Sequence, residues 1–103
     1  MNFKSLLNND GEELAHMITA FKILSDPTRC RILCLLAASK DGMCVYELAD
    51  ATNISHSAAS HQLSKLESHT IVQSFREGQK ICYRVCDNMF TKNLFKILAI
   101  FTK

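Results

Sequence analysis

Apolar residues recur at helical spacing in three stretches of this 103-residue chain. In residues 12–24 they return every three or four positions, which predicts an amphipathic helix. The segment "CRILCLLAAS", which follows "SDPTR", is apolar nearly all round. We therefore expect a central helix there, with Ser25 or Asp26 as its N-cap. Residues 87–101 repeat the helical pattern, and Asp87 is the expected N-cap of that last helix.

Shorter patterns lie between these helices. "VYELADAT" and the segment 57–69 read as two helices joined by the tight connection "NIS". The runs "IVQSF" and "KICYRV" flank a turn with a glycine, which predicts a β-hairpin. We therefore predict a mainly α fold with a β-hairpin wing (α+β). It is a single winged helix-turn-helix domain over residues 12–103, preceded by an N-terminal arm over residues 1–11.

The connection between the two short helices meets three requirements of a helix-turn-helix. Ala49 is small enough to let two helices cross closely. Asn53 stands where the turn needs a positive φ, which Asn tolerates better than most residues. Ser55 is a good N-cap for the next helix, and Ile54 and Ala59 fill the angle between the helices from inside.

The second helix of such a motif enters the major groove of DNA, where its early residues touch base edges and phosphates. Short polar side chains suit this close approach, and a Gln can pair bidentately with adenine. Two basic residues flank the hairpin turn, within reach of the minor groove or the phosphates. The predicted DNA-binding residues are Ser55, His56, Ser57, Ser60, His61, Gln62, Lys65, Arg76 and Lys80.

Three other interpretations of this serine- and histidine-rich helix are weaker. Its polar residues are also compatible with a simple solvated face. His56 and His61 lie five positions apart, about 140° around a helix, so they cannot share one metal ion without a kink. A nucleophilic serine would need a partnered acid and an oxyanion loop, which the sequence lacks. We therefore expect neither a metal site nor an enzyme.

Composition and charge indicate less about the function than the helix-turn-helix pattern does. The net charge of +2 is too small to indicate a nucleic-acid-binding protein, although residues 55–84 are mildly basic. No apolar run reaches the roughly 18–20 residues of a membrane span, and the first residues lack a secretory pattern, so we expect a cytoplasmic protein with no membrane partner. The chain has five cysteines, an odd number, and no secretory signal pattern. Both facts argue against a disulfide framework and favour reduced thiols.

Three segments, "LSDPTRCRILCLL", "ELADATNISHSAASHQLSKLESHTIV" and "REGQKICYRV", resemble the ArsR/SmtB family of bacterial winged-helix repressors. The resemblance covers roughly residues 14–101. It implies a homodimeric, sequence-specific transcriptional repressor that binds inverted-repeat operators in double-stranded DNA. It also implies release from the operator when a thiol-reactive compound, a metal ion or a metalloid binds. Soft metals, arsenite and sulfur species are therefore the expected inducers, and no permanent cofactor is expected.

The metal sites of the family are incomplete in this chain. The resemblance implies four zinc ligands between the terminal helices of two subunits; Asp87 matches one, whereas Met89, Ile100 and Lys103 stand at the other three positions. The "CVC" pair of cadmium and lead sensors is "CVY" here, beginning at Cys44. We therefore predict neither of these metal sites.

The thiols remain as candidate sensors. Cys34 matches the first cysteine of the sulfide- and persulfide-responsive members, but Thr102 stands near the second position. Cys30 and Cys34 lie one helical turn apart and either bind one soft ion or pack as small hydrophobic side chains. Cys44 precedes a helix, whose N-terminal dipole favours a reactive thiol. We predict inducer sensing at Cys34, Cys30 and Cys44, with Cys34 buried in the packed interior.

The last helix carries too many apolar faces for a helix that meets water on one side. This excess predicts a dimer surface shared with the helix over residues 12–24. A dimer would place two recognition helices about 34 Å apart, one turn of DNA. Two other functions stay open: a cysteine-based metal or thiol-binding module without DNA binding, and a winged helix used in protein–protein assembly.

Overall fold

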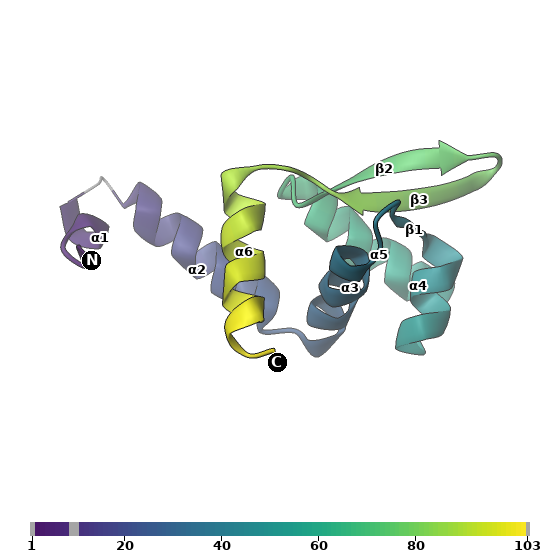
Figure 1. The fold of residues 1–103 in the computed structure, drawn as a ribbon, viewed down its shortest axis with the longest axis horizontal. Coiled ribbons are helices and arrows are strands. Elements are labelled where there is room, and N and C mark those ends of the chain that lie inside the picture. The colour runs from purple at the N-terminus through teal and green to yellow at the C-terminus, as the bar shows by residue number, and fades with distance from the viewer. Residues whose placement is uncertain (1, 9–10, 103) are drawn as a thin grey trace.

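The computed structural model describes residues 2–8 and 11–102 and contains the predicted winged helix-turn-helix. The elements, in chain order, are α1 (Ser5–Asn8), α2 (Glu12–Leu24), α3 (Pro27–Ala38), β1 (Met43–Cys44), α4 (Val45–Thr52), α5 (His56–Ser68), β2 (Val72–Glu77), β3 (Lys80–Val85) and α6 (Met89–Ile100). α1 and the tip of the β2–β3 hairpin lie at opposite ends of the long axis (Figure 1). None of the described helices has the length and apolar character that crossing a membrane requires. The predicted arm over residues 1–11 contains α1, but Met1, Asn9 and Asp10 lie outside the described residues.

The wing is a three-stranded antiparallel sheet in the order β1–β3–β2. β2 and β3 pair along their whole lengths, as the sequence predicted, with β2 running two residues beyond the expected end. β1 pairs with the other edge of β3, with Met43 opposite Tyr83 and Cys44 opposite Cys82. Sequence patterns did not predict β1, because a strand of two residues shows no alternation.

The core lies where α3, α4, α5 and α6 meet the sheet. Its side chains come from every one of these helices, so the domain closes around one apolar cluster. The side chains with no exposed surface in this cluster are Ile32, Leu33, Leu48, Ala59, Leu63, Leu66, Ile71 and Leu94. Burying each large side chain contributes about 1.5–3 kcal/mol relative to leaving it exposed.

The turn between α4 and α5 has the predicted local geometry. Asn53 ends α4 in the left-handed conformation, with φ 58° and ψ 44°. The Ile54 N–H then donates to the Ala49 carbonyl oxygen at 3.1 Å. Ser55 caps α5, because its side-chain oxygen accepts a hydrogen bond from the Ala58 N–H at 3.1 Å. The expected roles of Asn53 and Ser55 are therefore confirmed.

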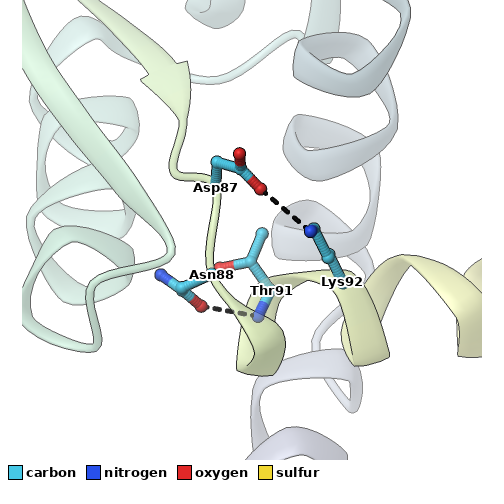
Figure 2. Close-up of polar contacts among 4 residues, drawn as sticks. All are labelled: Asp87, Asn88, Thr91 and Lys92. Carbon is cyan, nitrogen blue, oxygen red and sulfur yellow. Dashed lines mark hydrogen bonds and ion pairs between the residues drawn. The ribbon is translucent and has the colours of Figure 1, made fainter.

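The N-cap of α6 is Asn88, so the prediction of Asp87 was wrong by one residue (Figure 2). The Asn88 Oδ1 accepts from the Thr91 N–H at 2.9 Å, and its Nδ2 donates to the Thr70 carbonyl oxygen at 2.7 Å. The side chain of an ionised Asp has no donor for the bond to the Thr70 carbonyl oxygen, which explains why Asn serves better here. Asp87 instead forms an exposed ion pair with Lys92 at 3.3 Å.

Two glycines with positive φ allow a matched test of the wing. Gly42, just before β1, has φ 86°, and an added Cβ would lie 2.5 Å from the Tyr83 carbonyl oxygen and 3.0 Å from the Phe75 ring. Gly78, in the hairpin turn, has φ 66°, and an added Cβ would meet nothing within 4 Å. Both positions require a backbone conformation that is strained for alanine, but only Gly42 also lacks space.

We expect Gly78→Ala to lower the free energy of unfolding by about 1–2 kcal/mol, from backbone strain alone. Gly42→Ala should lower it by about 2–5 kcal/mol, because overpacking adds to the same strain. Urea unfolding monitored by circular dichroism gives the free energy of unfolding of both variants. Equal losses at the two glycines would contradict the close approach of β3 to Gly42.

Candidate nucleic-acid interface

The orientation of α5 is set by its buried side. Ala59, Leu63 and Leu66 have no exposed surface, and their spacing of four and three residues places them on one face of the helix. The other faces therefore point away from the core. The predicted DNA-binding residues of α5 and its cap that are exposed are Ser55, His56, Ser57, His61 and Lys65, while Ser60 is half-buried.

The first turn of α5 presents polar groups together. The hydroxyl oxygens of Ser55 and Ser57 lie 3.3 Å apart, beside backbone N–H groups that have no partner within the helix. The N-terminus of a helix carries a partial positive charge and favours anions such as phosphate. Ser57 and His61 are one helical turn apart on the exposed side, so their side chains extend from the same face. This arrangement suits contact with a phosphate backbone and with adjacent base edges.

Gln62 does not extend from this face. Its Oε1 accepts from Arg29 Nη1 at 3.2 Å, and its Nε2 lies 3.5 Å from Asp26 Oδ2. Asp26 also caps α3, and Arg29 donates to the carbonyl oxygens of Lys22 and Ile23. The amide of Gln62 thus fixes α5 against the connection between α2 and α3. Pairing with adenine would require Gln62 to leave these contacts.

Two basic residues stand near the turn of the wing, and the strand register places their side chains on opposite faces of the hairpin. Arg76 and Lys80 are exposed on the two strands that flank the hairpin turn. Lys80 Nζ lies 4.9 Å from the centre of the Tyr46 ring and 3.4 Å from its hydroxyl oxygen. A cation over a tyrosine ring is an attractive arrangement, so Tyr46 on α4 helps to place Lys80.

A groove of about 500 Å³ separates α5 from the wing. Its polar lining consists of Tyr46, His56, Ser60, Ser64, Gln79, Lys80 and Tyr83. Of these, Tyr46, Ser64, Gln79 and Tyr83 were not among the predicted site residues. The position of Ser64 was recognisable from its spacing, since it follows Ser60 by four residues and His56 by eight. The other three were not recognisable, because they join the groove only through folding.

One pair of cysteines differs from the expectation of reduced thiols. Cys44 and Cys82 are joined as a disulfide, here called the wing disulfide, between β1 and β3. The prediction of a free, reactive Cys44 is therefore wrong in this structure. The two residues are 38 positions apart in sequence, and only the pairing of β1 with β3 brings them together.

Three cysteines are free. Cys34 is exposed, so the expectation that it is buried is wrong: α3 turns Ile32, Leu33 and Leu36 to the core, and Cys34 lies on another side. The Cys30 thiol is half-buried and donates to a carbonyl oxygen of α2 at 3.0 Å. Burial raises the pKa of the thiols of Cys30 and Cys86, which leaves less of the reactive thiolate at neutral pH.

Potential metal ligands converge at one place within residues 2–8 and 11–102. The side chains of Cys44, Glu77 and Cys82 offer ligand atoms that all lie within 4.8 Å of one another. No histidine of α5 belongs to such a group in the described part of the chain.

Comparison with known proteins identifies the family. The model of the arsR family of bacterial regulatory proteins matches residues 26–74. A transcriptional repressor SmtB homolog from Synechocystis is 36% identical over 88 residues, which cover 85% of this chain and 64% of that protein. The crystal structure of the AntR antimony-specific transcriptional repressor superposes with a TM-score of 0.74 at 34% identity, covering 97% of this chain and 93% of that one. The chain belongs to the ArsR family.

Membership of the ArsR family, a family of transcriptional regulators, confirms the expectation that the chain is not an enzyme. A homodimeric winged helix-turn-helix DNA-binding domain from Mycobacterium bovis, itself a possible ArsR-family regulator, superposes with a TM-score of 0.73 at 26% identity. That match covers 90% of this chain and 84% of the mycobacterial domain. The chain spans about three fifths of the length of the first curated relatives that it matches.

The zinc-ligand positions that the ArsR/SmtB resemblance implied do not form a cluster among the described residues. Asp87 is paired with Lys92, and Met89 and Ile100 are exposed. The fourth position, Lys103, lies outside the residues that the structure describes.

Proposed function

We propose that this chain is a homodimeric repressor that binds a specific inverted-repeat operator through α5 and the wing, and leaves it when an inducer reacts with its thiols. One observation carries the proposal. The core-facing side of α5 turns the short polar side chains of its first two turns outward, and His56 and Ser60 of α5 line one groove together with Lys80 of the wing. Membership of the ArsR family supports it.

Each part of the interface has a separate role. Ser57 and His61 contact base edges in the major groove, because they lie one turn apart near the start of α5. Ser55 and His56 contact a phosphate at the helix N-terminus, and Lys65 reaches the DNA backbone one turn beyond His61. The base contacts read the DNA sequence, and the phosphate contacts orient the protein on the duplex.

The dimer forms through the terminal helices. α2 and α6 pack together through an edge contact between His16 and Phe90, whose ring centres are 6.1 Å apart. Both helices keep large apolar side chains uncovered, which is unfavourable in water and favours a partner surface. The exposed apolar residues of α2, of α6 and of its C-cap are Leu14, Ile18, Phe21, Met89, Ile100 and Phe101. The mycobacterial neighbour, itself a homodimer, supports a dimeric state.

Release begins at α3. Cys34 is the exposed thiol of that helix, and Cys30 lies one turn before it, next to Arg29. Arg29 holds Gln62 of α5, so a group added to these thiols acts on the helix that fixes the recognition helix. Arsenite, a soft metal ion and a persulfide are inducers of suitable chemistry, since a thiolate displaces hydroxide from arsenic, binds the metal ion, or attacks the outer sulfur of the persulfide and releases its thiol.

The first test addresses α5. Combined Ser57→Ala and His61→Ala substitutions should abolish specific operator binding, because each lost base or phosphate contact costs about 1–3 kcal/mol. The matched control is Ser68→Ala with His69→Ala, the same residue types at the exposed C-terminal end of the helix. Gel shifts on operator and random DNA, with circular dichroism and size-exclusion chromatography, measure affinity, fold and dimer. Unchanged specificity in the first variant would remove the assignment of α5 as recognition helix.

The second test addresses the wing. Replacing Arg76 and Lys80 with Ala should weaken binding to all DNA sequences and reduce the salt slope of the affinity by about 1–2 units. Lys92→Ala with Lys96→Ala, exposed positions on α6, should leave the slope unchanged. The measurement is the DNA-binding constant of each variant as a function of salt concentration. A loss confined to one operator sequence would contradict contact with the backbone.

The third test addresses release. Cys34→Ser should keep operator affinity and lose the response to the active inducer, because the accessible thiol of α3 is gone. Cys86→Ser is the control, since that thiol follows the wing and lies far in sequence from α3. Gel shifts of both variants against arsenite, cadmium, zinc and an organic persulfide provide the readout. If Cys34→Ser and Cys30→Ser both respond like the wild type, release through α3 is wrong.

A further inference from the structure

Three possible ligands meet where the wing joins the helix-turn-helix. Cys44 is the N-cap of α4 and the end of β1, Glu77 ends β2, and Cys82 lies in β3. The sulfur atoms and a carboxylate oxygen of these residues all lie within 4.8 Å of one another. Side chains from three different strands of one sheet therefore converge on a single small volume.

The surroundings of the two sulfurs favour a thiophilic ligand. Cys44 and Cys82 are 5% and 0% exposed, whereas Glu77 is exposed, so the carboxylate borders the group on the solvent side. In the wing disulfide the two sulfurs are bonded while Cys44 and Cys82 keep their paired positions in β1 and β3. Two thiolates with one carboxylate are ligands for zinc and cadmium, while magnesium and calcium select oxygen ligands.

We propose that, once a dithiol or phosphine reductant has supplied two electrons and water two protons to open the wing disulfide into two thiols, Cys44, Cys82 and Glu77 bind one soft divalent cation, such as Cd²⁺ or Zn²⁺. Each thiol loses its proton to solvent as its sulfur bonds to the cation, and no electron is transferred. Three protein ligands leave a fourth coordination position for water. The disulfide and the cation exclude each other, because the same two sulfurs are used in both.

Binding at this site would act on the wing. Glu77 is the neighbour of Arg76 and pairs across the hairpin with Lys80. Holding its carboxylate against the sulfurs therefore constrains the strand ends that carry both basic residues. Cys44 transmits the same constraint to the start of α4. The effect on operator affinity rests on the proposed function, whereas cation binding itself does not.

Cadmium titration of the full chain tests the site without DNA. The starting protein carries Ser at the three other cysteines, Cys30, Cys34 and Cys86, is reduced with a phosphine and is checked by circular dichroism. We expect one Cd²⁺ per chain, with the near-ultraviolet absorption of a cadmium–thiolate bond. Further Cys44→Ser or Cys82→Ser should lower the affinity by more than about 100-fold, and Glu77→Gln by about tenfold. Glu13→Gln, an exposed carboxylate on α2, should change nothing.

Two results would overturn the site. One is cadmium binding that is unaffected by Cys44→Ser and Cys82→Ser. The other is a wing disulfide that persists under the phosphine, detected as two sulfurs that resist alkylation, since the cation needs free thiolates. Cadmium binding as expected in a protein that binds no operator would support the site and reject the proposed function. Operator binding without cadmium at these thiols would reject the site alone.

Discussion

The close crossing of α4 and α5 is the constraint on which the rest of the structure depends. Ala49 and Ala59 are buried at 6% and 0% exposure, and a larger side chain at either position would hold the helices apart. Asn53 turns the chain between them in a left-handed conformation with φ 58°. Once the helices cross in this way, Leu63 and Leu66 fix the rotation of α5. The polar residues of its first turns then face away from the core, and His56 and Ser60 line the groove beside the wing.

A second contact ties α5 to the N-terminal half of the domain. Arg29 of α3 and Asp26, the N-cap of that helix, hold the side-chain amide of Gln62, with the shorter bond at 3.2 Å. α5 is thus supported by α4 at its N-terminus and by the start of α3 at Gln62. A change in α3 or in the wing reaches α5 through these contacts. This gives a regulator two separate points at which its affinity for DNA can be altered.

The sequence predicted features that depend on neighbouring residues and missed those that depend on distant ones. The turn at Asn53 and the cap at Ser55 follow from local backbone chemistry, and both were predicted. The cap of α6 was misplaced because Asn88 is selected by the carbonyl oxygen of Thr70, 18 residues earlier. The wing disulfide was missed because a two-residue strand sets its pairing. The exposure of Cys34 was misjudged because an apolar helix does not reveal which of its sides the core covers.

The central claim is that two copies of α5 read two half-sites on one face of the duplex. Its most direct test is chemical footprinting of the protein on DNA selected from a random library by its own binding. The account predicts two patches of major-groove protection with centres about 10–10.5 base pairs apart, or a multiple of one helical turn. A single protected patch, or protection spread evenly along the duplex, would contradict it.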